Sequence, residues 1–163
     1  MPKLPESVFQ RRVQAEYHEM QKSGYKFSVN TDRTAYEISM EARALQKIGG
    51  KVSVLSSHKF RIEINRNYPY AGGFSVVWLT PIFHPNIDNK TGKVCIHLLN
   101  DWAASQTIAS LVKGIEHLLK NPNVKSPLNV EAGEYFYFHP ELIEGKFQGI
   151  ESSPGKPKIV LQK

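Results

Sequence analysis

The stretch HPNIDNKTGKVCIHLLNDW, residues 84–102, is the part of this sequence from which the interpretation starts. It contains the triplet His84-Pro85-Asn86, followed by Cys95, the only cysteine in the chain. A thiol can attack a carbonyl carbon, and the side-chain amide of an asparagine can donate a hydrogen bond to the oxyanion that results. The stretch therefore predicts a nucleophile, Cys95, with a neutral oxyanion donor, Asn86, beside it.

The composition is that of one soluble globular domain. The chain has 163 residues, of which 40% are hydrophobic and 22% charged, enough for a single core and short for two. Its apolar runs fall far short of the roughly 20 residues that cross a membrane. The N-terminal sequence MPKLPESVFQRR has no apolar core typical of a secretory signal. A single cysteine excludes an internal disulfide and indicates a reducing, cytoplasmic location.

The charge is basic and spread along the chain. Lys and Arg number 21 against 15 acidic residues, a net charge of +6. This favours acidic partners, either nucleic acid or an acidic protein surface. The sequence lacks an aromatic RNA-binding signature, zinc-finger spacing and a dense basic helix, so we expect no nucleic-acid partner. Diffuse positive charge serves solubility equally well.

Residues 5–22 predict an amphipathic N-terminal helix, with Pro5 in its first turn and Gly24 after its end. Apolar side chains recur at near four-residue intervals, a stripe typical of core packing rather than of a ligand site. These side chains are Phe9, Val13, Tyr17 and Met20.

A run of strands follows. Apolar and polar residues alternate in segments 25–30, 36–41 and 60–65, as in antiparallel strands packed on one face. Residues 74–79 are more continuously apolar, which predicts a better-buried strand. Gly49-Gly50 predicts a turn after which a neighbouring strand continues.

The second half of the chain alternates between loop and helix. Residues 81–106 lose periodicity but keep apolar side chains, which predicts a long, ordered, functional loop. Residues 107–120 predict a strong amphipathic helix, and 129–137 and 140–148 predict shorter ones. The predicted class is therefore α+β with one antiparallel sheet. The Pro-, Gly- and Lys-rich segment 151–163 is expected to be a tail.

From about residue 60 to residue 132, a series of short motifs occurs in a specific order and spacing. They are Tyr68-Pro69, Thr80-Pro81, His84-Pro85-Asn86-Ile87, Gly92, Cys95, Trp102, Thr107-Ile108, Asn121-Pro122, Ser126-Pro127-Leu128-Asn129 and Glu131-Ala132. In this order and spacing the motifs resemble those of the ubiquitin-conjugating enzymes. The closing SPLN-x-EA is more similar to prokaryotic or archaeal-type members than to the usual eukaryotic ones.

The resemblance implies a ubiquitin-conjugating fold: an N-terminal helix, a four-stranded antiparallel meander, a long active-site loop and C-terminal helices. Residues 1–150 would be the catalytic domain, acting as a monomer without metal or cofactor. An activating enzyme would pass ubiquitin, or a ubiquitin-like protein, to Cys95 as a thioester. A substrate lysine or a ligase cysteine would then attack that thioester.

The resemblance also implies roles for the neighbours of Cys95. Asn86 would either donate to the oxyanion or brace the loop, and His84 would fix the loop by hydrogen bonding rather than act as a base. Many members carry Asp where this chain has His97, so direct transfer to lysine is in doubt, although a neutral His can serve as a base. The acidic position before the Pro-Leu pair is Ser126 here, so the incoming amine would meet a less acidic site.

Partner surfaces follow from the same resemblance. Arg11 and Arg12 of the first helix would meet an acidic domain of the activating enzyme, although a merely solvated basic face is an equal alternative. Tyr70 and the segment after Trp102 would bind a ligase. Ala104 replaces the usual proline there, which makes binding to a typical ligase less predictable.

Several other readings remain open. Cys95 would be a small core residue if its surroundings were apolar, which Lys93 and His97 argue against. A catalytically weak module of the same fold would only bind ubiquitin-like proteins. A metal site would draw on Cys95, His97, His84 and His117, without the paired close spacing usual for such sites. A papain-like protease would need His139 as its base, and no motif surrounds that residue.

Overall fold

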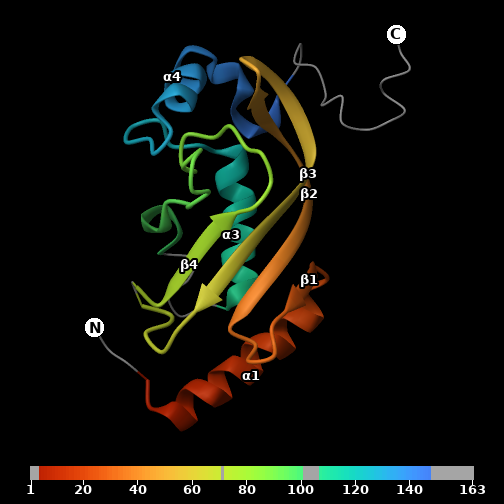
Figure 1. Ribbon diagram of the computed structural model, residues 1–163, viewed down its shortest axis with the longest axis vertical. Helices are drawn as coiled ribbons and strands as arrows, with labels where there is room; N and C mark the ends of the chain where they lie inside the picture. The colour runs from red at the N-terminus through yellow and green to blue at the C-terminus, as the bar shows by residue number, and fades with distance from the viewer. Residues whose placement is uncertain (1–3, 71, 101–106, 148–163) are drawn as a thin grey trace.

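Four antiparallel strands, paired in chain order, form one sheet in the computed structural model, which describes residues 4–70, 72–100 and 107–147 (Figure 1). Each predicted strand is present, and the predicted α+β class with a four-stranded antiparallel meander is confirmed. The strands are β1 Lys26–Val29, β2 Ala35–Ile48, β3 Lys51–Ile64 and β4 Phe74–Trp78.

Helices precede and follow the sheet in the predicted order. The segment predicted as a helix from Pro140 to about residue 148 is instead a short 3₁₀ helix, which ends at Gly145. The helical segment is only the six residues Pro-Glu-Leu-Ile-Glu-Gly, and a segment this short is rarely stable as an α-helix. The elements are α1 Glu6–Ser23, η1 Ile96–Leu99, α3 Ile108–Lys120, α4 Val130–Phe138 and η2 Pro140–Gly145.

One face of the sheet is buried and the other is polar. Tyr36, Ile38 and Ile62 have no exposed surface, whereas their strand neighbours Glu37 and Arg61 face outward and form an ion pair. This is the period-two pattern read from the sequence. The apolar face of α3 covers the buried side, and α1 crosses the lower end of the sheet (Figure 1).

The hairpin of β2 and β3 is much longer than the alternation predicted. It turns at Gly49 and Gly50, whose φ angles of 60° and 81° belong to the left-handed region that glycine adopts without strain. A register shift between Glu41 and Ala44 interrupts the pairing. Beyond that shift the hairpin tip packs on the C-terminal elements in a second apolar cluster, comprising Leu45, Val54, Phe83, Ala132, Phe136, Leu142 and Phe147.

A buried carboxylate joins α1 to α3. Glu16 is 1% exposed; its Oε2 accepts a hydrogen bond from Arg12 Nε at 2.8 Å, and its Oε1 accepts one from the backbone N–H of Ile108 at 2.7 Å. The first N–H groups of a helix have no partner within the helix. Glu16 therefore supplies an acceptor, from a different element, for the N–H of Ile108 at the start of α3.

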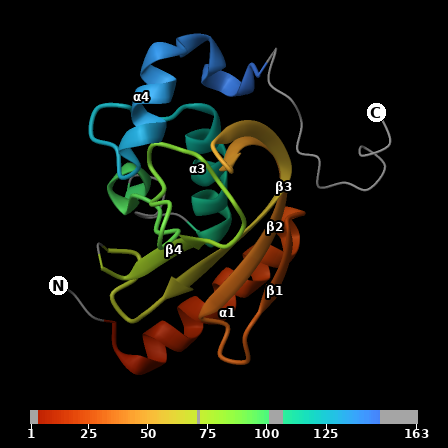
Figure 2. The ribbon, with the colours of Figure 1, turned by 45° about the horizontal axis from the view of Figure 1, so that its top comes forward.

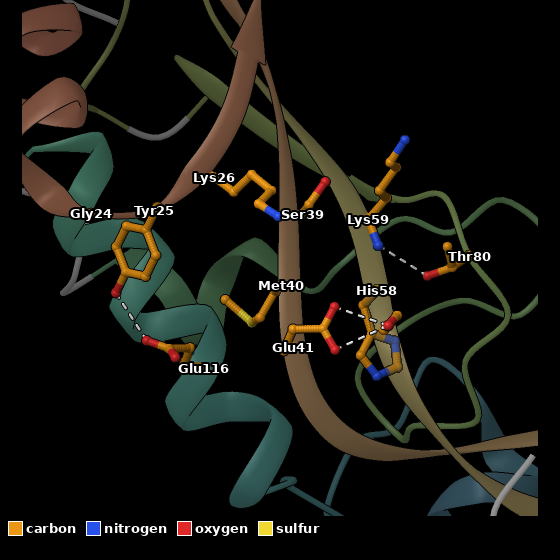
Figure 3. Close-up of a pocket in the computed structure, with 11 residues that line it drawn as sticks. Gly24, Tyr25, Lys26, Ser39, Met40, Glu41, His58, Lys59, Thr80 and Glu116 are labelled. Atoms are coloured by element: carbon orange, nitrogen blue, oxygen red, sulfur yellow. Dashed lines mark hydrogen bonds between the residues drawn. The ribbon is translucent and has the colours of Figure 1, made fainter.

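A hollow of about 750 Å³ lies at the edge of β2 beyond the end of β1 (Figure 3). Tyr25 donates a hydrogen bond to Glu116 Oε1 across it at 2.9 Å, and burial with that bond raises the pKa of Tyr25 to about 12. Neither Cys95 nor the His84-Pro85-Asn86 triplet lines this hollow.

Candidate active site

The loop that follows β4 folds back along β4 and returns beside it. Val94 N–H donates to Val76 O at 3.0 Å, and Trp78 N–H donates to Gly92 O at 2.7 Å. Isolated bridges pair Val77 with Lys93 and Ile87 with Val94. The loop lies between α4 and the sheet in both views (Figures 1 and 2). Lys93 and Val94 thus pair like a short extra strand that leads directly to Cys95.

The turn of this loop depends on two residues. Gly92 has a φ of +79°, and a Cβ at this position would lie 2.3 Å from Trp78 O, so no other residue fits. The Asp88 carboxylate accepts hydrogen bonds from Thr91 N at 2.7 Å and Thr91 Oγ1 at 2.8 Å. The backbone and hydroxyl bonds from Thr91 hold the pKa of Asp88 below its usual value. Asp88 is therefore a charged turn-forming residue rather than an acid for catalysis.

His84 lies at the centre of the packing beneath the loop. Its Nε2–H donates to Leu118 O in the last turn of α3 at 2.8 Å, and its Nδ1 accepts the backbone N–H of Asn86 at 3.0 Å. Burial lowers the pKa of His84 to about 4. With both ring nitrogens engaged and the ring neutral at physiological pH, His84 holds the loop on α3 and has no nitrogen left for a base.

The Asn86 side chain is clamped to the backbone of Asn123. Its Nδ2 donates to Asn123 O at 2.8 Å, and its Oδ1 accepts the N–H of Asn123 at 2.8 Å. Its backbone carbonyl accepts the N–H of Cys95 at 2.9 Å. Asn86, which is 2% exposed, therefore ties the Cys95 loop to the segment after α3.

Cys95 is half-buried and stands immediately before η1. Its backbone is extended, with φ −67° and ψ 103°, and its carbonyl accepts the N–H of Leu98 at 3.2 Å. The structure brings His84, Asn86 and Cys95 together in one continuous hydrogen-bonded set. The half-buried Cys95 thus stands on a backbone that is hydrogen-bonded on both sides.

The segment before α4 is fixed to the same loop. The N–H groups of Leu128 and Asn129 both donate to Pro85 O, at 2.8 and 3.1 Å. Asn129 Oδ1 then accepts the N–H of Ala132 and caps α4. Ser126 is exposed and lies between this anchor and the Asn123 clamp. The Ser-Pro-Leu-Asn motif is thereby placed beside the His84-Pro85-Asn86 triplet.

The remaining residues implied by the resemblance lie at the surface or outside the described chain. His97 is exposed on η1, and Arg11 is exposed on α1. Tyr70 is 50% exposed. Trp102 and Ala104 lie outside the described residues.

Arg12 has a structural role that the sequence did not reveal. Besides bonding Glu16, its guanidinium lies 4.8 Å from the centroid of the Tyr68 ring. Arg12 is therefore partly committed within the fold, in contrast to its neighbour Arg11.

The alternative sites receive no support from this geometry. No group of three or more His, Cys, Asp or Glu side chains that could hold a metal ion occurs among the described residues. His139 stacks on Tyr135 at 4.4 Å, and its Nδ1 lies 2.7 Å from Tyr135 O, so its ring is engaged within α4. Within the described ranges, no helix has the length and apolar character to cross a bilayer.

Two contacts that hold the Cys95 loop have no signal in the sequence. Asn123 holds Asn86 through its backbone N–H and C=O, which any residue carries, so its identity gave no signal. Leu118 likewise meets His84 through its carbonyl. Glu16 had a signal: a carboxylate on the apolar side of an amphipathic helix implies a buried partner.

Comparisons with known proteins all point to one family. The family described as "Ubiquitin-conjugating enzyme" matches residues 12–148. The ubiquitin-conjugating enzyme E2 pex4 of Dictyostelium discoideum is 42% identical over 78 residues, which are 46% of this chain and 52% of that protein. The chain thus spans about half the length of that relative.

Two further similarities cover more of the chain. A probable ubiquitin-conjugating enzyme, E2 L460 of Acanthamoeba polyphaga mimivirus, is 30% identical over 139 residues, covering 77% of this chain and 81% of that protein. The E2 domain of a Toxoplasma gondii ubiquitin conjugating enzyme shares the fold, with a TM-score of 0.60 and 24% identity over 80% of this chain and 88% of that one. These proteins are eukaryotic or viral, so the prediction of a prokaryotic or archaeal-type member is not supported.

Proposed function

Because the chain belongs to the ubiquitin-conjugating enzyme family, we propose that Cys95 carries ubiquitin, or a ubiquitin-like protein, as a thioester. The observation that supports this most directly is the presentation of Cys95. Cys95, the only cysteine of the chain, is half-buried at the end of an extended segment, and its backbone N–H donates to Asn86 O.

In the first step the Cys95 thiolate attacks the thioester carbonyl carbon of the modifier held by the activating enzyme. A new C–S bond forms at Cys95, and the old one breaks to release the thiolate of the activating enzyme. One thioester replaces another, so the exchange is nearly isoenergetic. Both attack and release pass through a tetrahedral oxyanion that hydrogen-bond donors stabilise.

We assign Asn86 the role of brace. Its carboxamide already donates to Asn123 O and accepts from Asn123 N. These two bonds hold the Cys95 loop in one position against the segment after α3. A rigid supporting contact of this kind keeps reacting atoms in place, where a displacement of about 1 Å can cost about 100-fold in rate. His84 supports the same loop from beneath.

The second step transfers the modifier to an amine. A neutral lysine attacks the Cys95 thioester, a C–N bond forms, the C–S bond breaks, and the nitrogen gives up its proton. His97 is exposed two residues after Cys95, and an imidazole can act as the base that accepts such a proton. Ser126 would contribute a hydroxyl rather than a carboxylate to the amine's path.

Partner surfaces are proposed on the same basis. Arg11, exposed at the N-terminal half of α1, would contact the activating enzyme, with Arg12 contributing less because it bonds Glu16. Tyr70, Trp102 and Ala104 would contact a ligase. Protein substrates would supply the lysine, and the reducing cytoplasm would keep Cys95 a thiol.

The test is thioester loading. The protein is incubated with ATP, an activating enzyme and ubiquitin, and in parallel with ubiquitin-like proteins and their own activating enzymes. We expect an adduct on a non-reducing gel that a thiol reductant removes. Since Cys95 is the only cysteine, Cys95→Ala should abolish the adduct and Cys95→Ser should make it resistant to reductant.

Two outcomes would contradict the proposal. A reductant-sensitive adduct that persists in Cys95→Ala would assign the chemistry elsewhere. Binding of a modifier without any loading would favour the catalytically weak module of the same fold.

A further inference from the structure

The backbone from Lys93 to Cys95 is extended and held on both edges. Lys93 pairs with Val77 of β4, and its carbonyl accepts the N–H of Asp88 at 2.9 Å. Side chains of an extended segment alternate between its two faces. Val94 between them is 4% exposed and points into the core, so Lys93 and Cys95 lie on the same outward face.

The Lys93 side chain is exposed, and no ion pair or side-chain hydrogen bond engages its amine within the described residues. Two other lysines differ: Lys47 bonds Glu131, and Lys59 lies 3.9 Å from Glu37. The carboxylate nearest in sequence, Asp88, is occupied by Thr91. An amine without a carboxylate partner is available to react.

We propose that Lys93 is an internal acceptor: once Cys95 carries the modifier, the Lys93 amine takes it in the same molecule. This inference rests on the proposed function, because it needs the thioester on Cys95. Residues two apart in an extended segment are separated by about 7 Å, which the four methylene groups of a lysine can span.

The chemistry balances without a further reagent. The neutral Nζ of Lys93 attacks the thioester carbonyl carbon, a C–N bond forms, and the C–S bond breaks to release the Cys95 thiolate. The nitrogen passes one proton to water, and the product is an isopeptide bond on Lys93 beside a regenerated thiol. Because both reactants are on one chain, the effective concentration of the amine exceeds that of any free lysine in solution.

The consequence is a self-limiting enzyme. A modifier attached at Lys93 sits on the face from which Cys95 is reached and would obstruct the next loading. The lifetime of the loaded enzyme would then depend on a competition between Lys93 and external acceptors. Abundant substrate or ligase would keep the enzyme active, and its absence would close the site.

The experiment follows loaded protein in a single turnover without substrate. The wild type is loaded with ubiquitin by an activating enzyme and ATP, the ATP is then removed, and reducing gels record the reductant-resistant adduct over time. We expect that adduct to appear as the thioester decays, with peptide mass spectrometry placing it on Lys93. Lys93→Arg should load normally and form the adduct at least about tenfold more slowly.

Lys90→Arg is the matched control, since Lys90 is exposed in the same loop but lies in the Asp88 turn; it should behave as the wild type. Transfer within one molecule also predicts a rate independent of protein concentration. A mixture of loaded Lys93→Arg with Cys95→Ala should therefore leave the Cys95→Ala chain unmodified.

The outcomes separate this inference from the proposed function. Absence of any reductant-sensitive adduct on the wild type would overturn both. Normal loading followed by loss to water alone, or an adduct unchanged in Lys93→Arg, would overturn the Lys93 assignment and leave the thioester function standing.

Discussion

Asn86 is where a catalytic and a supporting role can be separated by measurement. Truncation in Asn86→Ala removes two hydrogen bonds and leaves the N–H and C=O of Asn123 without their partner. A hydrogen bond of this kind contributes about 0.5–1.5 kcal/mol, and water can reach the exposed Asn123 to replace part of it. We expect the unfolding free energy in urea to fall by about 1–3 kcal/mol, and loading and discharge to slow together, because the loop that holds Cys95 loosens.

Asn89 provides the control, since it is exposed in the same loop and Asn89→Ala should leave stability within about 0.5 kcal/mol. If Asn86→Ala kept its unfolding free energy while transfer fell about 100-fold, the amide would be a direct oxyanion donor.

His84 makes stability depend on pH in a defined window. Burial lowers its pKa to about 4 in the folded state, against about 6.5 for an unperturbed histidine. The unfolded chain therefore binds a proton at His84 more readily than the folded chain does. The contribution of neutral His84 to folding stability is thus complete above pH 6.5 and is lost as the pH falls toward 4. The loss is about 3 kcal/mol. Urea unfolding from pH 7 to 4.5 measures it.

His58 also has its pKa lowered by burial, so a comparison of variants isolates the effect of His84. His84→Gln should flatten the slope of stability against pH over this window. His97→Gln alters an exposed ring and should leave the slope unchanged. A His84→Gln slope identical to that of the wild type would show that His84 is not protonated on unfolding.

His97 should affect one chemical step more than the other. Loading exchanges thioesters, whereas discharge to lysine requires loss of a proton from nitrogen. His97→Asp places a carboxylate two residues from Cys95, and we expect it to change the rate of discharge to free lysine more than the rate of loading. Single-turnover discharge and loading, measured on the same preparation, give the two rates. Equal changes in both would remove any special role in lysine attack.

At the scale of the elements, Glu16 couples two helices through a single carboxylate. Glu16→Ala would leave Arg12 and the N–H of Ile108 without this acceptor. Breaking a buried charged contact on one side typically costs about 3–5 kcal/mol, and we expect a loss near the lower end because Arg12 is partly exposed. Glu19→Ala, one turn further along α1, removes a 3.7 Å surface pair with Lys22 and should cost under about 1 kcal/mol.

The elements also show which parts of the structure the sequence could predict. The alternation of apolar and polar residues predicted the regular parts of the strands, but it did not predict the part of β2 beyond the register shift. There Ala44, Leu45 and Gln46 are all buried, so the two-residue alternation is lost. Tertiary packing between the hairpin tip and α4 decides that region. In the candidate site, Cys95 and Asn86 could be singled out from the sequence because the chemistry of their side chains, a thiol and an amide, is distinctive. The Asn123 contact is made through its backbone, for which a side-chain pattern has no signal.

At the scale of the whole molecule, the β2–β3 hairpin connects two apolar clusters. Its lower half contributes Tyr36, Ile38 and Phe60 to the main core, and its tip contributes Leu45 and Val54 to the cluster beneath α4. The loop that carries Cys95 is attached to the tip as well, since Phe83 N–H donates to Leu45 O at 2.7 Å. Because β2 and β3 each contribute to both clusters on either side of the register shift, the two clusters should unfold together.

This coupling predicts that the chain unfolds in a single cooperative transition. A substitution in one cluster should therefore shift the unfolding of the other cluster equally. Leu45→Ala removes a side chain 1% exposed and should cost about 2–5 kcal/mol. In a Trp102→Phe background the remaining tryptophan, Trp78, reports the main core by fluorescence, while far-UV circular dichroism reports all elements. We expect both urea transitions to shift equally, because the main core cannot keep β2 and β3 ordered once their tip is released.

Ile48→Ala, at a tip residue 60% exposed, should shift neither transition by more than about 0.5 kcal/mol. If Leu45→Ala moved the dichroism transition and left the Trp78 transition in place, the tip and α4 would unfold as an independent unit.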